Sequence, residues 1–217
     1  MAQQGKLRGI VFDWDGTLLD SFASDLHAYR VMFHALGVPW GEAELRAHYS
    51  PNWHRVYEAA GIPPAQWKEA DRLWRQAYRG LRPALLPGAR QALHHLAEEY
   101  SLGLVTSGSR GRVTRQLRNF GLWRIFKARV FGEDCARRKP HPDPLQRGLR
   151  MMRLGAGECL YVGDSAEDVI MARRAGTRCV AVLGPFPTHE RLRAARPVTI
   201  LDSVRCLPAW LATRSAG

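Results

Sequence analysis

The feature of this sequence that most constrains its fold is a regular alternation of short apolar runs and helical stretches after residue 88. The apolar runs have strand length and lie at 102–106, 128–131, 159–162, 178–183 and 198–201. Helical patterns lie between and after them, at 88–99, 110–119, 142–152, 165–175 and beyond the last run. Apolar strands that alternate with helices predict a mostly parallel sheet covered by helices on both faces. We therefore expect a doubly wound, Rossmann-like α/β fold.

The N-terminal part of the chain adds one strand and a block of helices. Residues 7–12 form an apolar run that ends in an Asp-rich turn, which is typical of a buried strand. Helical spacing of apolar residues follows at 21–36, 42–60 and 64–80. The aromatic residues of this block can form a small core of their own: Tyr49, Trp53, Tyr57, Trp67, Trp74 and Tyr78. We expect residues 1–19 and 85–217 to form the Rossmann-like core and residues 20–84 to form an inserted α-helical domain.

Four polar clusters each follow a predicted strand, and ligands bind at the carboxyl ends of strands in sheets of this kind. They read FDWDGT at 12–17, TSGS at 106–109, RRKPHP at 137–142 and GDSAED at 163–168. Each cluster has a structural explanation as a turn, a helix cap or a solvated loop, and Ser165 with Asp168 fits a capping box. Asp164, at the strand tip before that cap, is harder to explain in this way. The four clusters together predict one site at one edge of the sheet.

This constellation resembles the haloacid dehalogenase-like superfamily, specifically its phosphoglycolate phosphatase-like branch. The motifs that carry the resemblance are FDWDGTLLDS (12–21), LVTSGS (104–109), RKPHPDP (138–144) and VGDSAED (162–168). The resemblance covers essentially the whole chain, and the helical insert corresponds to the cap domain of the family. It implies a magnesium-dependent phosphatase that hydrolyses a small phosphomonoester, with phosphoglycolate as a candidate, through an aspartyl-phosphate intermediate.

The resemblance also implies roles for individual residues. Asp13 corresponds to the nucleophile, and Asp15 corresponds to the group that protonates the leaving alcohol and then activates water. The expected catalytic set is Asp13, Asp15, Thr106 and Lys139, and the expected phosphate-binding set is Thr17, Thr106, Ser107 and Lys139. The expected metal set is Asp13, Asp15 through its main-chain carbonyl, Asp164 and, as an outer group, Asp168. Magnesium suits these oxygen-only ligands.

The sequence defines the substrate less well than it defines the reaction. Residues 48–55 occupy the place of the family's substrate-reading loop, but they lack the glycine that is usual in phosphoglycolate phosphatases. Arg46, His48, His54 and Arg55 are candidates for binding an anionic leaving group, with solvated surface as the competing explanation. A sugar-phosphate mutase is an alternative, against which Gly163 argues, because mutases of this branch typically carry an acidic residue there. A scaffold protein without activity is disfavoured by the complete motif set.

Composition limits the partners of the chain. The net charge is +12, and 28 arginines against 4 lysines are spread along the whole sequence. A phosphatase of nucleic-acid ends therefore remains an alternative, but the chain has no zinc-finger spacing and no aromatic-plus-basic RNA signature. The four cysteines form no CxxC pair, and the N-terminus has no long apolar stretch. We expect a cytoplasmic monomer or homodimer that acts on a small phosphorylated metabolite, away from membranes.

Overall fold

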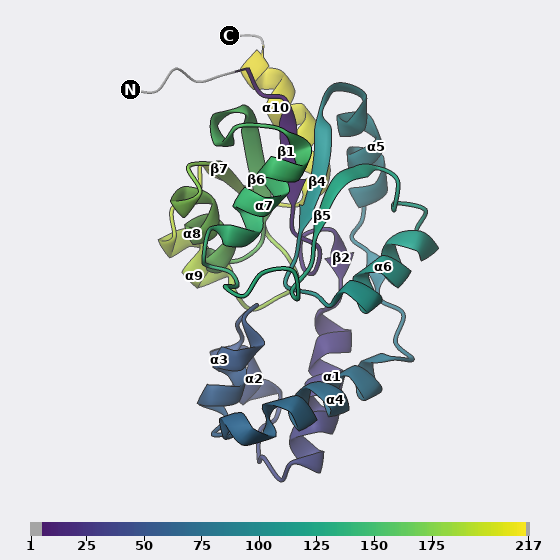
Figure 1. Cartoon of the computed structure of the whole chain (residues 1–217), viewed down its shortest axis with the longest axis vertical. Coiled ribbons are helices and arrows are strands. Elements are labelled where there is room, and N and C mark those ends of the chain that lie inside the picture. The colour runs from purple at the N-terminus through teal and green to yellow at the C-terminus, as the bar shows by residue number, and fades with distance from the viewer. Residues whose placement is uncertain (1–5, 216–217) are drawn as a thin grey trace.

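A single parallel sheet forms the larger lobe of the protein. The computed structural model describes residues 6–215, so the remaining residues of the expected core, 1–5 and 216–217, lie outside the described part. The six strands described are β1 (Gly9–Phe12), β4 (Ser101–Val105), β5 (Phe126–Val130), β6 (Cys159–Gly163), β7 (Arg178–Val182) and β8 (Thr199–Leu201). They are all parallel, in the order β5-β4-β1-β6-β7-β8 (Figure 1). The predicted doubly wound sheet is therefore confirmed.

The strand order makes the end of β1 the natural position for a site. Ile10 of β1 pairs with Leu102 of β4 on one side and with Leu160 of β6 on the other. The chain builds the β4–β5 half first and then crosses back to build the β6–β7–β8 half. A crevice forms at the carboxyl ends of the strands where the winding direction reverses. In this sheet the reversal lies at β1.

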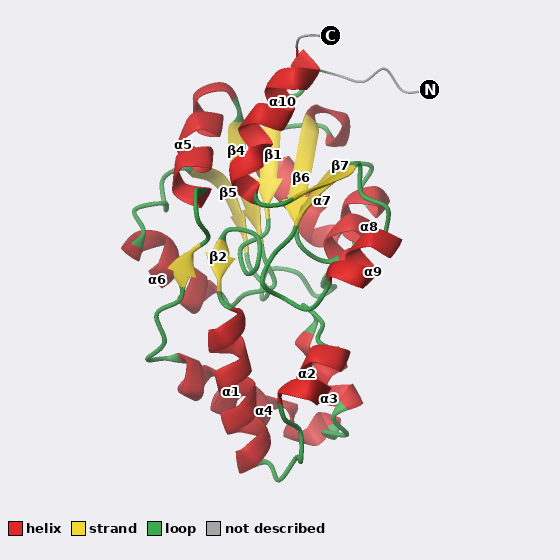
Figure 2. Ribbon diagram, turned by 180° about the vertical axis from the view of Figure 1, so that it is seen from behind, coloured by secondary structure: helices red, strands yellow, loops and turns green. Residues whose placement is uncertain are grey.

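Helices cover both faces of the sheet, as the sequence predicts. One face packs against α5 (Ala89–Glu99), α6 (Arg110–Asn119) and α10 (Leu207–Ser215), and the other packs against α7 (Asp143–Met152), α8 (Ala166–Arg174) and α9 (His189–Ala194). Figure 2 shows α5 and α10 in front of the strands, whereas α7 lies in front of them in Figure 1. Successive strand residues point to opposite faces, so Ile10 and Phe12 join the first layer and Val11 joins the second.

The second lobe is helical and lies at the carboxyl edge of the sheet (Figure 1). It contains α1 (Phe22–Ala35), α2 (Glu42–His48), α3 (Trp53–Ala59) and α4 (Trp67–Tyr78), which follows the short 3₁₀ turn Pro64–Gln66. Tyr29, Phe33 and Tyr57 are buried in its own apolar cluster, as expected from the aromatic content. Phe186, from the loop after β7, joins this cluster by stacking on Tyr49 at 4.6 Å. The two lobes are thus in direct contact.

The expectation of one helix over 42–60 is wrong, because the chain forms two. Tyr49 leaves the helix with an extended backbone (φ −57°, ψ 134°), and α3 begins only at Trp53. Pro51 explains the break, since it lacks an N–H and disfavours helical backbone at the residue before it. Within this break, Ser50 donates a hydrogen bond to Glu167 of α8 at 3.0 Å. The break therefore brings the helical lobe onto the sheet lobe.

Two short strands connect the lobes, and the sequence analysis did not anticipate them. β2 (Leu19–Asp20) and β3 (Ala84–Leu85) pair in antiparallel fashion, so the chain enters and leaves the helical lobe side by side. The helix α9 was also unanticipated. The division of the chain into residues 1–19, 20–84 and 85–217 stays a prediction. Within residues 6–215, no helix is both long enough and apolar enough to span a membrane.

Candidate active site

Three buried carboxylates meet at the carboxyl end of β1. Asp13 directly follows β1, and its N–H donates to the carbonyl of Val162 in β6 at 2.9 Å. Asp164 follows β6, and Asp168 lies in the first turn of α8. One carboxylate oxygen of each of these three aspartates lies within 4.8 Å of the other two. The parallel sheet thus brings together residues that are about 150 positions apart, for the topological reason given above.

Lys139 supplies a positive charge to this cluster. Its Nζ lies 2.9 Å from Oδ1 of Asp13 and donates a hydrogen bond to Oδ1 of Asp168 at 2.8 Å, and its side chain is only 2% exposed. Burial lowers the pKa of Lys139, but the charges of Asp13 and Asp168 outweigh it and raise the pKa above the ordinary value. Lys139 is therefore a fixed cation.

One lysine does not balance three carboxylates in a buried site. Burial raises the pKa of Asp13 to about 7, with Asp168 adding to the shift and Lys139 opposing it. Burial and the charges of Asp168 and Asp13 likewise raise the pKa of Asp164 well above its ordinary value. Excess negative charge that is provided by oxygen atoms alone is the environment that a divalent cation such as Mg²⁺ prefers. The residues present therefore fit a hard metal ion.

Asp168 has a full set of partners. Its Oδ2 accepts from the N–H of Ser165 at 3.2 Å and from the Ser165 hydroxyl at 2.6 Å, and its own N–H donates to Ser165 Oγ at 3.2 Å. This is the expected capping box at the start of α8. Its Oδ1 accepts from Lys139 and from the Tyr161 hydroxyl, at 2.9 Å from the latter. Asp168 therefore caps α8 and binds Lys139. Asp164 has fewer contacts, among them the hydrogen bond from Thr17.

Thr17, which the sequence analysis expects to bind phosphate, contacts Asp164 in the structure. Its fully buried hydroxyl donates to Oδ1 of Asp164 at 3.1 Å, and it is not among the residues that line the adjacent cavity. The turn at Gly16 causes this placement. Gly16 has φ +79°, and a Cβ on it would lie 2.2 Å from Oδ2 of Asp164, so the turn requires glycine. Thr17 therefore orients Asp164, and its phosphate-binding role stays a prediction.

The loop after β4 faces the same space as Asp13. Thr106 accepts the N–H of Gly108 on its hydroxyl oxygen at 2.9 Å, which fixes a tight turn before α6. Thr106 and Ser107 line a cavity together with Asp13 and Asp15. A hydroxyl-rich loop that leads into a helix N-terminus is suited to bind phosphate oxygens. The structure thus brings Thr106 and Ser107 to the same cavity as Asp13, whose carboxylate also lies 2.9 Å from Nζ of Lys139.

Asp15 has a strong partner that the sequence analysis missed. Arg112, in the first turn of α6, donates Nη1 and Nη2 to the two oxygens of Asp15 at 2.8 and 2.6 Å. Burial raises the pKa of Asp15, but the charge and hydrogen bonds of Arg112 outweigh it and lower the pKa below the ordinary value. The guanidinium also lies 5.1 Å from the ring centroid of Tyr78 and 5.9 Å from that of Trp74. The basic run SRGR at 109–112 was the available signal, but it does not reveal which arginine turns inward.

A cavity of about 160 Å³ lies between the two lobes at this site. The sheet lobe contributes Asp13, Asp15, Asp164 and the 106–109 loop, and the helical lobe contributes aromatic rings: Tyr29, Tyr49, Trp53, Tyr57 and Trp74. Three arginines also line it: Arg75, Arg112 and Arg138. A phosphoryl group beside Asp13 would therefore have its leaving group in aromatic surroundings.

The candidates Arg46, His48, His54 and Arg55 do not line this cavity. Arg46 pairs with Glu42 at 2.7 Å and lies over the Phe22 ring, and Arg55 is exposed. His48 stacks on Trp40 at 5.1 Å, and His54 stacks on Trp67 at 4.4 Å. These residues belong to the helical lobe's own packing and surface. The lining of the cavity thus gives no support to the hypothesis that one of these residues binds the leaving group, and the competing explanation is favoured.

Gly163 has a local structural role in addition to its place in the motif. A Cβ on Gly163 would lie 2.5 Å from Cγ of Asp168. The acidic residue that sugar-phosphate mutases typically carry at this position would thus displace Asp168, which holds both Lys139 and α8. The site of this chain does not accommodate the mutase-type residue.

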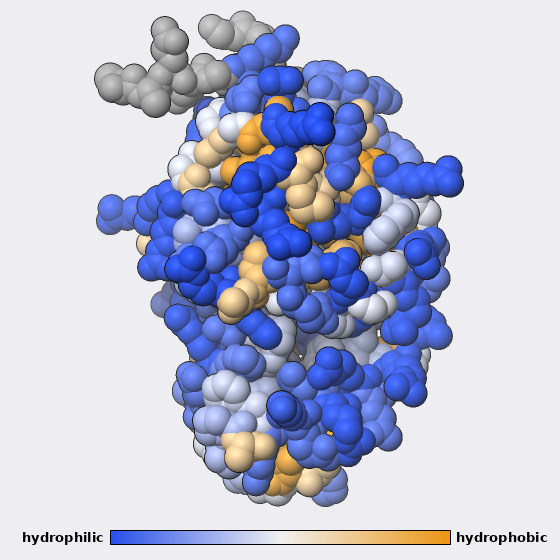
Figure 3. All heavy atoms as spheres, in the orientation of Figure 1, coloured by the Kyte–Doolittle hydropathy of each residue, from blue (hydrophilic) through white to orange (hydrophobic). Residues whose placement is uncertain are grey.

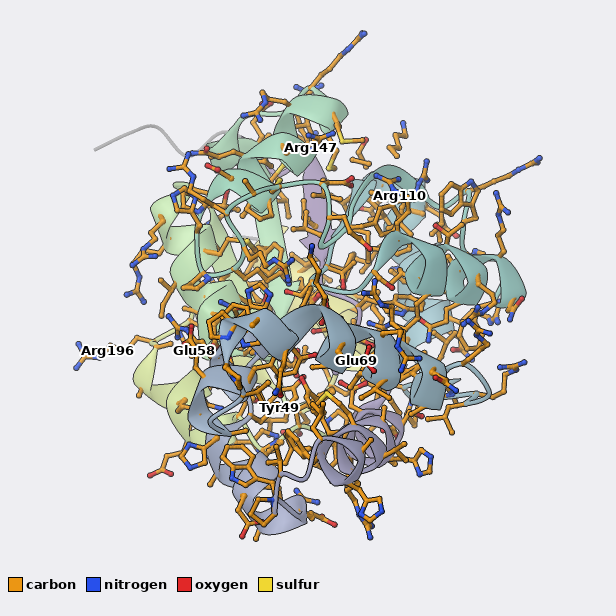
Figure 4. All side chains as sticks on the ribbon, turned by 60° about the horizontal axis from the view of Figure 1, so that its bottom comes forward. Tyr49, Glu58, Glu69, Arg110, Arg147 and Arg196 are labelled. Carbon is orange, nitrogen blue, oxygen red and sulfur yellow. The ribbon has the colours of Figure 1, made fainter. Side chains whose placement is uncertain are left out.

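Arginines lie on several sides of the molecule. Figure 3 shows a largely hydrophilic face with small groups of apolar residues, and Figure 4 shows Arg110, Arg147 and Arg196 on different sides of the molecule. Several arginines pair with acids, among them Arg8 with Glu158 at 2.7 Å. A basic stripe that follows a nucleic-acid backbone is the usual electrostatic footprint of polymer binding. The dispersed arrangement does not favour the nucleic-acid alternative.

Comparisons with known proteins find a matching family model, similar curated proteins and similar solved structures. The family model for haloacid dehalogenase-like hydrolases matches residues 10–182. A phosphoglycolate phosphatase of Cereibacter sphaeroides is 36% identical over 84% of this chain and 89% of its own length. A pyrophosphatase of Bacillus mycoides is 26% identical over 92% of this chain and 94% of its own length. The crystal structure of a hydrolase from Pseudomonas syringae superposes with a TM-score of 0.85 at 25% identity, covering 95% and 98% of the two chains.

Proposed function

Because the chain belongs to the haloacid dehalogenase-like hydrolase family, we propose that it is a phosphatase that hydrolyses a small phosphomonoester through an aspartyl-phosphate on Asp13. The observation that carries this proposal is the position of Asp13. It lies at the switch point of the sheet, beside Lys139 and Asp164, and it opens onto the cavity between the lobes. A carboxylate in such a position can attack phosphorus in line with a leaving group that points toward the helical lobe.

The reaction then has two displacements. In the first, a carboxylate oxygen of Asp13 forms a bond to phosphorus, the ester P–O bond breaks, and the alcohol leaves with a proton from Asp15. In the second, water attacks the phosphorus of the aspartyl-phosphate and gives a proton to Asp15. The bond between phosphorus and Asp13 breaks, and inorganic phosphate leaves. Thr106 and Ser107 bind phosphoryl oxygens, and Lys139 balances the charge between Asp13 and the phosphoryl group.

Arg112 stabilises the form that Asp15 has between the two displacements. A carboxylate that receives two hydrogen bonds from one guanidinium is held in a single orientation and in its ionised form. This is the form that accepts a proton from water in the second displacement. The proton that Asp15 gives to the alcohol in the first displacement is replaced by the one that it takes from water in the second, so each further turnover begins with a protonated Asp15. The first turnover takes this proton from solvent, and protonation weakens the attraction to Arg112.

The carboxylates of Asp13 and Asp164 and the main-chain carbonyl of Asp15 would hold a Mg²⁺ ion, with Asp168 behind them. When bound, the ion withdraws charge from the phosphoryl oxygens and offsets the negative charge of the cluster. Thr17 fixes the rotamer of Asp164 through its 3.1 Å hydrogen bond. We assign the inner position to Asp164 rather than Asp168, because both oxygens of Asp168 already have partners.

Residues 20–84 act in this proposal as a cap over the site. The paired strands β2 and β3 are the narrow connection, and the aromatic rings of the helical lobe form the far wall of the cavity. A cap over the carboxylates excludes bulk water from the first displacement and limits the size of the leaving group. Phosphoglycolate is a candidate substrate, because the relative from Cereibacter sphaeroides is a phosphoglycolate phosphatase.

A phosphate-release screen of small phosphomonoesters with Mg²⁺, followed by rapid acid quenching with ³²P-labelled substrate, tests the proposal. Parent protein should release phosphate and carry transient acid-stable label, whereas Asp13→Asn should lose turnover by several orders of magnitude and carry no label. Asp13→Asn activity near the parent level would refute the covalent mechanism. Transfer of the label to a second position on the substrate, without release of phosphate, would instead identify a mutase.

A further inference from the structure

The three arginines that line the cavity differ in their partners. Arg112 is paired with Asp15, as described above. Arg75 is paired with Asp71 at 3.6 Å and also donates to the Asp71 carbonyl at 3.0 Å. The Arg138 guanidinium has no hydrogen bond or ion pair with any residue of the part that the structure describes, and its Nη1 is buried without a partner. A buried donor without an acceptor is costly and rare in folded proteins.

Arg138 is held in place by a ring rather than by an acid. Its guanidinium carbon lies 3.8 Å from the ring centroid of Trp53, which belongs to α3 of the helical lobe. Stacking on an aromatic face fixes the plane of a guanidinium and leaves the in-plane N–H groups available. Since Arg138 belongs to the sheet lobe and Trp53 to the helical lobe, this arrangement is formed by both lobes together. It is an organised group of donors rather than a solvated side chain.

The acids near Arg138 are engaged elsewhere. Asp71 accepts the hydroxyl of Tyr57 at 3.0 Å in addition to its contact with Arg75. Glu133 accepts the main-chain N–H of Arg110 at 2.9 Å. Both acids line the cavity, but neither lies within 4.0 Å of the Arg138 guanidinium. The cavity is therefore lined by a guanidinium that forms no ion pair within the described residues, on the residue that precedes Lys139 in the chain.

We propose that Arg138, stacked on Trp53, binds an anionic group carried by the leaving group of the substrate, either a carboxylate or a second phosphate. This inference rests on the proposed function, since it places the leaving group in the cavity beyond Asp13. Both anions present oxygen acceptors that match the fork of a guanidinium. Arg138 is then a specificity-determining residue, and it selects phosphorylated acids or bisphosphates over neutral phosphomonoesters of the same size.

Three substrates with two carbon atoms each test this proposal: 2-hydroxyethyl phosphate, phosphoglycolate and ethane-1,2-diyl bisphosphate. The readout is the ratio of kcat/KM for each anionic substrate to kcat/KM for the neutral one. Arg138→Met should lower this ratio by about 10- to 100-fold, the range of a lost charge-assisted hydrogen bond. Arg138→Lys should give an intermediate ratio. The anionic substrate whose ratio falls further in Arg138→Met shows which group, the carboxylate or the second phosphate, Arg138 binds better.

Arg137→Met is the matched control, because Arg137 is the exposed neighbour whose guanidinium pairs with Asp143 at 2.8 Å. It should keep the parent ratio. An unchanged ratio in Arg138→Met, or a parent that favours the neutral substrate over both anions, would overturn the assignment. Circular dichroism and thermal melting check that each variant is folded.

A binding measurement separates this proposal from the proposed function. In the Asp13→Asn background, calorimetry with phosphoglycolate and with the bisphosphate should show weaker binding when Arg138→Met is added. Equal binding by the single and double variants would refute the Arg138 site even if the parent is an active phosphatase. Weaker binding by the double variant would support the Arg138 site even if the parent hydrolysed none of the three substrates. That result would refute the proposed function and leave the Arg138 site standing.

Discussion

At the scale of single residues, the dominant feature is excess negative charge that folding buries. Asp13, Asp164 and Asp168 share one cation, Lys139. The pKa of Asp13 is raised to about 7, and that of Asp164 is raised well above its ordinary value. Such shifts mean that the ionised carboxylates oppose folding until a cation compensates them. The buried carboxylates prepare the site for a cation, and in its absence they lower the free energy of unfolding.

This arrangement predicts that the free energy of unfolding depends on pH when a chelator removes metal ions from the protein. The pKa of Asp13 is about 7 in the folded state against a reference value of 3.8, so folding favours its protonated form. Its contribution to the free energy of unfolding therefore falls as the pH rises from 3.8 toward about 7. We expect the Tm of Asp13→Asn to rise relative to the parent Tm across this window, and Mg²⁺ at pH 8 to raise the parent Tm most. A Tm difference that is independent of pH would contradict the charge argument.

Asp164 and Asp168 should respond differently to substitution. Asp164→Ala should abolish most of the increase in Tm and in activity that Mg²⁺ produces, while leaving the metal-free Tm near or above that of the parent. Asp168→Ala should lower the metal-free Tm instead, because it removes the cap of α8 and a partner of Lys139. Melting curves with and without Mg²⁺ distinguish the two. Equal losses of metal response from both substitutions would overturn the ranking.

At the scale of elements, the N-termini of α6 and α8 carry the groups that orient the site. The capping box of α8 is local, since Ser165 and Asp168 are three residues apart. The contribution of α6 is not local, because Arg112 reaches Asp15 across 97 positions. Gln116, one turn further along α6, accepts the indole N–H of the buried Trp14 at 2.9 Å. Helix α6 is thereby fixed against the loop that carries Asp13 and Asp15.

Replacing Arg112 should therefore change the titration of Asp15. Arg112→Met removes the charge and the two hydrogen bonds that lower the pKa of Asp15 against the effect of burial. We expect the limb of the pH–kcat profile that belongs to Asp15 to move to higher pH, and kcat to fall by about 10- to 100-fold. Arg112→Lys should restore part of the shift because it retains a charge. A lower kcat with an unmoved profile would show that Arg112 acts only through packing against Tyr78 and Trp74.

At the scale of the whole molecule, the cavity between the lobes and the dispersed positive charge decide which substrates arrive and fit. The Phe186–Tyr49 stack and the Ser50–Glu167 hydrogen bond join the lobes beside the cavity. A cavity of about 160 Å³ suits a small leaving group better than a polymer. The net charge of +12 attracts anions of any size at long range, and salt screens this attraction.

We expect kcat/KM for small phosphomonoesters to exceed that for a 5′-phosphorylated oligonucleotide by orders of magnitude, because the cap limits access. Raising the ionic strength should lower kcat/KM of the small anions moderately, through the rate of association. Steady-state kinetics of both substrate classes at two salt concentrations measure these effects. Faster hydrolysis of the oligonucleotide, with a steep dependence on salt, would show instead that the basic surface binds nucleic acid.

The sequence by itself determined the order of strands and helices and the positions of the four motifs. These features depend on local patterns: apolar runs of strand length, helical spacing, and polar residues just after strands. Because parallel strands end at one edge, the pattern also predicts that Asp13, Thr106, Lys139 and Asp164 lie near one another. The fold was thus predictable, whereas the roles given to these residues stay predictions until they are tested.

Only the tertiary structure decided which side chains are partners. Thr17 with Asp164, Asp15 with Arg112, and Arg138 with Trp53 are pairs distant in sequence. Nothing in their local sequence distinguishes Arg112 or Arg138 from the 26 other arginines, because the inward orientation of a long side chain depends on how the helices and lobes pack. The same dependence explains why Arg46, His48, His54 and Arg55 are not among the residues that line the cavity. Motif positions follow from chain topology, but specificity follows from packing between the lobes.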